Sequence, residues 1–323
     1  MRIAPLQFLQ VDYAVASSAP MFAFRGPPTM RSSFLGAPNG RNVIAGERKP
    51  AIDCCVDGMQ SPAGVYEDFL VRWQLRPWTA VLLAEAGIRP GERILDLATG
   101  TGIVAREAAP FVGERGRIVA LDINPAMMTV GRSLPEPAGA SIEWLEGDAA
   151  ALPLPDAAFD TVLCQQGLQY FADRPAAAVE VRRVLASGGR TLLVVWRALS
   201  HNPVQEALNA AGRCRVGVAL LATAFGLGDA GEVGRLFESA GFTDVTITGR
   251  ELVVVFPSRA EFVRRMVESV AHVVPELAGL DSLQRAELAS AINEDARATL
   301  QLHAWGGGLA CPMAAHLIQA RTG

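Results

Sequence analysis

The chain has 323 residues, half of them hydrophobic, with a mean hydropathy of +0.24, which excludes a protein that is disordered throughout. This length allows one elaborated domain or two small ones. A net charge of −4 and an isoelectric point near 5.7 argue against nucleic acid as the main partner, because such partners require basic surfaces. No unbroken apolar run approaches the roughly 18–20 residues of a membrane helix, so we expect no membrane span.

The cysteines and histidines give no sign of a metal site. The five cysteines form no C-x-x-C pair, and their odd number argues against a disulfide framework or a zinc site. No group of carboxylates and histidines has metal-ligand spacing either, so we predict a metal-independent protein. A reducing cytoplasm fits this cysteine usage best.

Residues 1–58 differ from the rest of the chain. They are rich in proline, glycine, serine and arginine and keep no helical or strand period, so we expect little order there. Three explanations stay open: a start codon assigned too early, with Met59 as the true start, an organelle transit segment, or a flexible regulatory tail. The predicted organisation is therefore an extension over 1–58 and one domain over 59–323.

From residue 59 onward, helices and strands alternate. Helical spacing over 64–88 predicts a helix that breaks at Pro77, because proline lacks the N–H that a helix interior needs. Strands are predicted over 93–98, 117–122, 141–148, 159–165 and 188–196, with helices over 103–109, 125–133 and 174–185 between them. Apolar strands separated by helices indicate a parallel sheet covered on both faces.

After Trp196 the pattern becomes mainly helical. Helices are expected over 201–225, 229–241, 258–272 and 283–303, with strands over 244–256 and 316–321. We expect the late helices to lie between the last two strands and to cover the ligand edge of the sheet. The predicted fold is α/β, a doubly wound Rossmann-like, mostly parallel sheet with a helical cap, segments 201–227 and 258–304, inserted before the last strand.

The stretch GTGIVA, Gly100–Ala105, follows a strand and opens a helix. It satisfies the G-x-G-x-x-A pattern of dinucleotide sites, and Asp122 lies about 20 residues further on, as an NAD site requires. Taken alone, the pattern favours an NAD-dependent oxidoreductase, although a bare structural turn has the same sequence.

Acids that follow three successive strands favour another cofactor. Asp96 comes just before the loop, where a carboxylate would repel pyrophosphate but attract the ammonium group of S-adenosylmethionine (SAM). Asp122 can accept hydrogen bonds from both ribose hydroxyls. Asp148 can accept one from the adenine amino group, while the backbone of Ala149 meets the ring edge. Each acid alone could simply cap the next helix, but the three together favour SAM.

These motifs together resemble the class I SAM-dependent methyltransferases, especially the bacterial group similar to ubiquinone and menaquinone C-methyltransferases. The resemblance covers the chain from residue 64 onward and implies SAM as the cofactor, held by three loops, with LASGGR as the turn after the core. The loops are LDLATGTG with Asp96, Ala98, Thr99, Gly100 and Gly102, LDINPAM with Asp122 and Ile123, and GDAAALP with Asp148 and Ala149.

The chain departs from the family pattern at three points. Ala98 takes the place of the first glycine of the D-x-G-x-G-x-G loop, and we expect close ligand approach to survive if its φ is negative. Ser187 replaces a frequent proline. The sequence CQQGLQYFADR after the fourth strand lacks the FGLRN-like string of the quinone enzymes, so quinone specificity is not implied.

The resemblance implies transfer of a methyl group to a small acceptor by in-line displacement, in which alignment and exclusion of water matter most. Gln165 and Gln166 follow the fourth strand and could hold the methionine end or the substrate, or simply close the strand. Tyr66 could close over the ligand or serve packing alone. His201, beyond the fifth strand, is the candidate general base, with a solvated loop histidine as the alternative.

The apolar cap segments suggest a small apolar or aromatic acceptor. Plain packing or a homodimer interface would explain the same composition. Two rival functions stay open: an NAD-dependent oxidoreductase on the same fold, and a non-catalytic SAM-binding protein.

Overall fold

The computed structural model describes residues 61–271 and 274–323, all of which belong to one structural unit. The predictions for residues 1–58, and the start at Met59, lie outside the described residues. The division of the chain into an extension and one domain therefore stays a prediction.

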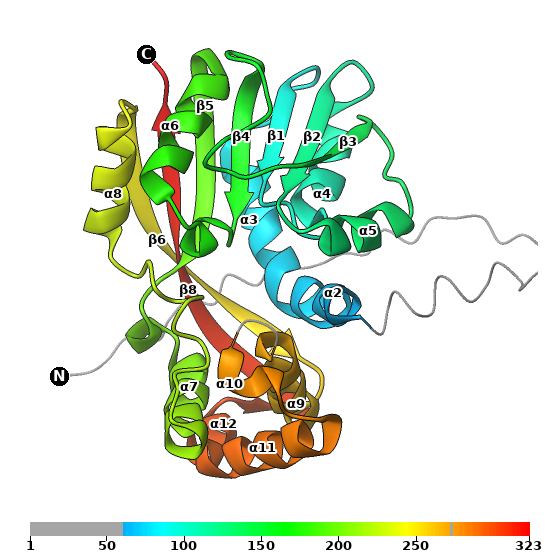
Figure 1. The fold of residues 1–323 in the computed structure, drawn as a ribbon, viewed down its shortest axis with the longest axis vertical. Coiled ribbons are helices and arrows are strands. Elements are labelled where there is room, and N and C mark those ends of the chain that lie inside the picture. Colours follow the sequence, from blue (N-terminus) through cyan, green and yellow to red (C-terminus); the bar gives the residue numbers. More distant parts are fainter. Residues whose placement is uncertain (1–60, 272–273) are drawn as a thin grey trace, which may run out of the picture. The chain divides into compact units, whose positions relative to one another are not determined.

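A single sheet with the strand order β3-β2-β1-β4-β5-β8-β6 forms the centre of the fold, and β7 (Ala304–Trp305) pairs with β8 (Figure 1). Neighbouring strands from β3 through β5 are parallel, whereas β8 is antiparallel to both β5 and β6. The bounds are β1 Arg93–Leu97, β2 Arg117–Asp122, β3 Ile142–Glu146, β4 Phe159–Gln165, β5 Leu185–Trp196, β6 Thr243–Phe256 and β8 Gly308–Arg321. The predicted fold class, a doubly wound and mostly parallel α/β sheet, is confirmed.

Two clusters of buried apolar side chains hold helices against this sheet. One cluster contains the inner faces of α3 (Arg76–Ala86) and α4 (Ile103–Val112), and the other those of α6 (Arg174–Val184) and α8 (Ala230–Ser239). Successive residues of β1 alternate between the clusters, Ile94 in the first and Leu95 in the second, because side chains of a strand point to opposite faces. The helix α5 (Pro125–Ser133) packs on β2 and β3.

The cap lies where β6 and β8 extend beyond the rest of the sheet (Figure 1). It consists of α7 (Pro203–Val216), α9 (Arg259–Val270), α10 (Pro275–Ala278), α11 (Ser282–Asp295) and α12 (Arg297–Leu302). The last four helices lie between β6 and β8 in the chain, as predicted. Two details were wrong: the helix expected over 201–225 ends at Val216, because Gly217 takes a left-handed φ of 75°, and the helix expected over 283–303 is two helices.

The first described helix does not break at Pro77, contrary to the prediction. The helix α2 (Pro62–Val65), the π-helix η1 (Tyr66–Leu75) and α3 follow one another directly, and we call Pro62–Ala86 the covering helix. The Arg76 N–H bonds the Val71 carbonyl five residues back, and Pro77 follows at the start of α3. Because proline has no N–H to place, the change from π to α geometry occurs there without leaving a donor unpaired.

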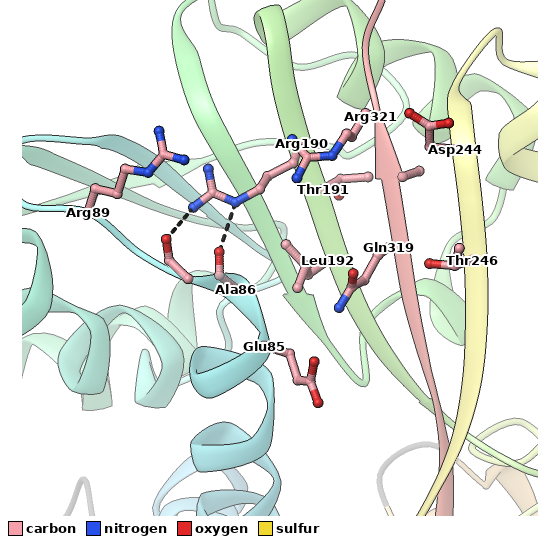
Figure 2. Close-up of a pocket in the computed structure, with 12 residues that line it drawn as sticks. Glu85, Ala86, Arg89, Arg190, Thr191, Leu192, Asp244, Thr246, Gln319 and Arg321 are labelled. Atoms are coloured by element: carbon pink, nitrogen blue, oxygen red, sulfur yellow. Dashed lines mark hydrogen bonds between the residues drawn. The ribbon is translucent and has the colours of Figure 1, made fainter.

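A buried ion pair fixes the end of α3 beside an open groove of about 440 Å³ (Figure 2). Arg190 donates from Nε to the Ala86 carbonyl at 2.8 Å and from Nη2 to the Gly87 carbonyl at 3.1 Å. It also pairs with Glu92 at 3.0 Å, and the two side chains are only 15% and 10% exposed. The groove lies near the beginnings of β5 and β6, away from the carboxyl ends of the parallel strands.

We predict that Arg190→Met lowers the free energy of unfolding by roughly 3–5 kcal/mol, because the buried Glu92 carboxylate loses its partner. The matched control is Arg250→Met. Its pair with Glu85, at 2.7 Å, is more than one-third exposed on both sides and should contribute less than about 1 kcal/mol. Urea denaturation measures both values, and equal losses would contradict the dependence on burial.

Candidate functional site

The loop after β1 lies at the carboxyl edge of the sheet, where β1 has β2 on one side and β4 on the other. This is the point at which the strand order reverses, and ligands of doubly wound sheets bind there. The Thr99 N–H donates to the Leu121 carbonyl at 3.0 Å, which fixes the loop to the end of β2. The loop then enters α4 through Gly102, whose N–H donates to the Thr99 carbonyl at 2.8 Å.

Asp96 is 1% exposed, and only one of its carboxylate oxygens is satisfied. Its Oδ2 accepts hydrogen bonds from the Thr99 hydroxyl at 2.5 Å and from the Ala105 N–H at 2.9 Å. Its Oδ1 is buried without a partner among the described residues. Burial raises the pKa of Asp96 to about 7. A cationic donor at Oδ1 would satisfy this oxygen and favour the ionised carboxylate.

Asp122 ends β2 and faces the same loop. Its Oδ2 accepts from the Gly100 N–H at 2.7 Å and its Oδ1 from the Asn124 N–H at 2.8 Å. Burial raises its pKa. Each carboxylate oxygen can accept a second hydrogen bond, so hydroxyl groups of a ligand remain compatible with this arrangement. The next residue, Ile123, is 66% exposed and offers an apolar surface beside the carboxylate.

Asp148 and Ala149 lie just beyond β3, which ends at Glu146. Asp148 is exposed, and its Oδ1 accepts from the Ala150 N–H at 2.9 Å, which closes a turn. Ala149 is buried. The carboxylate therefore has a structural role in the turn, and its contact with a nucleobase stays a prediction.

Ala98 does not meet the expectation of a negative φ. Its φ is +54°, in the left-handed region, which costs an alanine roughly 1–2 kcal/mol. Its side chain has room because Gly167, after β4, faces it: a Cβ built on Gly167 would lie 2.5 Å from the Ala98 Cβ. The alanine in the loop thus depends on a glycine on the neighbouring chain segment.

Gly102 could carry no side chain at all. Its φ is +85°, and a Cβ there would lie 2.3 Å from the indole ring of Trp144 on β3. Close packing of the loop on this ring explains the glycine at the start of α4.

The covering helix lies over the glycine loop. The Tyr66 hydroxyl would be 3.7 Å from a Cβ built on Gly100. Glu67 accepts hydrogen bonds from the Thr101 hydroxyl at 2.5 Å and from Arg106 Nη2 at 2.8 Å. Burial raises the pKa of Tyr66, so the phenol stays protonated. The sequence drew attention to Tyr66 but not to Glu67 and its two partners, because contacts across more than 30 residues leave no local pattern.

The two glutamines after β4 differ in their contacts. Gln165 accepts from the Thr79 hydroxyl at 2.9 Å and donates to the Leu75 carbonyl at 3.0 Å, so its amide holds the covering helix against the sheet. Gln166 takes a φ of +56°, and its Nε2 is buried without a partner among the described residues. Its Oε1 accepts from Gln169 Nε2 at 3.0 Å, so only the N–H donors of the Gln166 amide remain available to a ligand.

His201 has contacts that do not support its predicted role as a base. It is exposed on η3 (Leu199–His201), and Arg197 Nη2 lies 3.0 Å from its Nε2. A guanidinium can only donate, so this contact occupies the lone pair that would take a proton. The role of His201 as a general base, like its alternative as a solvated loop histidine, stays a prediction.

In the part of the chain that the structure describes, no group of three or more His, Cys, Asp or Glu residues could hold a metal ion. Within the same residues, no helix has both the length and the apolar character needed to cross a membrane.

Sequence comparison relates the chain to one group of enzymes. The sequence model of the ubiE/COQ5 methyltransferase family matches residues 63–211. The ubiquinone/menaquinone biosynthesis C-methyltransferase UbiE of Shewanella frigidimarina is 32% identical over 172 residues, 52% of this chain and 68% of that protein. The UbiE of Hahella chejuensis is 33% identical over 166 residues, 51% of this chain and 66% of that protein. The chain thus spans about two thirds of the length of these relatives.

Structure comparison gives the same fold. Phosphoethanolamine N-methyltransferase 2 of Haemonchus contortus, solved in complex with S-adenosyl-L-methionine, matches with a TM-score of 0.51 and 16% sequence identity. The match covers 84% of this chain and 59% of that chain. At this identity, the likeness shows the shared fold alone.

We predict that Asp96→Asn gains stability over the wild type as pH rises. The pKa of Asp96 is about 7 in the folded chain, against an ordinary value of 3.8. Between these two values the folded chain keeps the proton and the unfolded chain loses it. The contribution of Asp96 to the free energy of unfolding therefore decreases as the pH rises from about 4 to about 7. The difference between variant and wild type should grow by on the order of 3 kcal/mol across this window. Urea denaturation at pH 4.5 and pH 8 measures it, and a constant difference would refute the raised pKa.

A second prediction concerns the packing of Ala98 on Gly167. Gly167→Ala should lower the free energy of unfolding by roughly 1–3 kcal/mol, because the new methyl group meets the Ala98 Cβ. In an Ala98→Gly background the loss should shrink, although the contact with Cys164 Sγ at 2.9 Å remains. A double-mutant cycle measures this coupling, which should exceed about 0.5 kcal/mol. Strictly additive effects would mean that the two side chains do not share this space.

Proposed function

The chain belongs to the ubiE/COQ5 methyltransferase family, and from this premise we propose that it transfers a methyl group from SAM to a small acceptor. The unpartnered Oδ1 of Asp96 is the observation that carries the proposal. It is an oxygen buried at the ligand edge of the sheet, and a cationic donor would satisfy it and favour the ionised carboxylate.

The residues present fit SAM at three points. Asp96 would hold the ammonium group, and Asp122 would accept from the ribose hydroxyls. Ile123, exposed beside Asp122, would pack on the adenine ring, with Asp148 and the backbone of Ala149 near the ring edge. Thr99, Gly100 and Gly102 would line the loop, and Ala98 would tolerate close approach because Gly167 faces its methyl group.

The chemistry requires positioning rather than a nucleophile on the protein. When bound, SAM supplies a methyl group that its sulfonium charge already activates. The chain would fix the donor through Asp96 and Asp122. Glu67 bonds the covering helix to Thr101, and Tyr66 lies beside Gly100, so this helix would shield the bound donor from water. Orientation of this kind can supply up to about 7–11 kcal/mol. Cys164 at the end of β4 stays a thiol, because burial raises its pKa to about 12.

The acceptor is proposed to be small and apolar or aromatic. The face of the cap that meets the covering helix is lined with aromatic side chains: the ring of Phe69 lies 5.4 Å from Phe256 and 6.4 Å from Phe262, between centroids. An acceptor that reaches the donor from the side of the cap would contact this apolar surface, which favours an apolar or aromatic molecule.

Of the two rival functions, the oxidoreductase conflicts with the site. A buried carboxylate with a free oxygen before the glycine loop would repel the pyrophosphate of NAD. A SAM-binding protein without activity has the same cofactor contacts, so only methyl transfer distinguishes it from the enzyme.

Titration calorimetry tests the proposal. We predict that SAM and S-adenosylhomocysteine bind, that NADH does not, and that Asp96→Asn weakens both affinities about 10–100-fold through loss of a charge-assisted hydrogen bond. Glu143→Gln, on the exposed side of β3 where Glu143 pairs with Arg117, is the control and should bind normally. Binding of NADH in place of SAM would overturn the assignment. Labelled methyl transfer from SAM to a small molecule in cell extract then separates the enzyme from the binding protein.

A further inference from the structure

Three arginine side chains line the open groove beside the end of α3: Arg89, Arg190 and Arg321 (Figure 2). The first half of β5, the last residues of β8 and the first residues of β6 form the other parts of the groove wall. This is the edge of the sheet opposite to the glycine loop, so the groove is separate from the proposed cofactor site.

Two of these arginines oppose each other on neighbouring strands. In the antiparallel pairing of β5 with β8, Arg190 is directly opposite Arg321. Residues that oppose each other in this way have their side chains on the same face of the sheet, with Cβ atoms roughly 4.5–5.5 Å apart, and like charges there destabilise the pairing. The sequence thus places positive charge on the groove where strand pairing alone disfavours it.

The nearby acids leave two of the three arginines without a counter-charge. Both carboxylate oxygens of Glu92 accept hydrogen bonds from Arg190, at 3.1 and 3.0 Å. Glu85 lines the groove but pairs with an arginine outside it. The guanidinium groups of Arg89 and Arg321 have no hydrogen bond or ion pair with any described residue. Two positive charges on the groove are therefore unpaired.

Polar side chains of β8 and β6 also line the groove. Gln319 lies two residues before Arg321, on the same face of β8, and is opposite Thr246 on β6. Asp244 takes a left-handed φ of +51° at the register shift between Thr243 and Thr246, and a bulge of this kind changes the direction of a side chain. The side chains of Asp244, Thr246 and Gln319 make no hydrogen bond to a described residue, so all three can bind hydroxyl groups of a ligand.

We propose that this groove binds a small phosphomonoester that carries hydroxyl groups, with Arg89 and Arg321 on the phosphate. A phosphomonoester has a charge of about −1.5 to −2 and three acceptor oxygens, which matches two unpaired guanidinium groups better than a carboxylate with one charge. Guanidinium groups bind phosphate through paired hydrogen bonds. The hydroxyl groups would donate to Asp244 and Gln319, where a second anionic group would meet the aspartate charge.

Titration calorimetry of the full chain tests this with ribose 5-phosphate, ribose and inorganic phosphate, at about 0.15 M salt to screen weak surface attraction. We expect ribose 5-phosphate to bind at least tenfold more tightly than inorganic phosphate, and ribose not to bind. Arg89→Met and Arg321→Met should each weaken the binding of ribose 5-phosphate at least tenfold. Gln319→Leu should reduce its advantage over inorganic phosphate. The matched control is Arg213→Met, an exposed arginine of α7 whose side chain has no partner among the described residues.

Melting curves supply a second readout. Without ligand, Arg321→Met should melt at or above the wild-type temperature, because the like charge opposite Arg190 is gone. A lower melting temperature with unchanged affinity would assign Arg321 to packing and overturn the inference. Equal weakening by Arg213→Met, or equal binding of ribose, would also overturn it, and an unchanged advantage of ribose 5-phosphate in Gln319→Leu would contradict the hydroxyl contacts. The binding of SAM is measured separately, so the proposed function would stand in each case.

Discussion

Asp96 lies buried at the ligand edge of the sheet, with one oxygen bonded to the start of α4 and the other without a partner among the described residues. The bonded oxygen orders the loop, because it joins Thr99 and Ala105 across the turn. The other oxygen is the one to which the ammonium group of SAM is proposed to donate. The order of the loop and the proposed ligand contact thus come from the same carboxylate, and a cation at its second oxygen would favour the ionised form that burial disfavours.

The covering helix connects this loop to the rest of the molecule. Glu67 holds it to the beginning of α4, Gln165 holds its second half to β4, and Phe69 packs on the cap. A movement of this helix would therefore alter the cofactor loop and the contact with the cap together. Because its first half is π-helical, its side chains over the loop follow a spacing that an α-helix would not give.

The family match covers the loops of the proposed cofactor site but only the first part of the cap. The family match over residues 63–211 contains the loops at the carboxyl edge and ends within α7. The helices α9 to α12 lie beyond it, between β6 and β8. Cofactor binding is thus proposed on residues within the matched region, whereas Phe256 and Phe262, which meet the covering helix, lie outside it.

The sequence by itself determined the elements and the edge where they meet. Periodicity gave β2, β4 and α5 with their bounds, and the positions of Asp96 and Asp122 after parallel strands placed both at one edge. Only the tertiary structure decided the remaining contacts: the left-handed Ala98 opposite Gly167, Glu67 on Thr101, and the hydrogen bonds from Gln165 to the covering helix. The physical reason is the distance along the sequence over which each kind of interaction acts. Strand and helix periods are set by neighbours in the chain, whereas burial and hydrogen-bond partners come from residues dozens of positions apart.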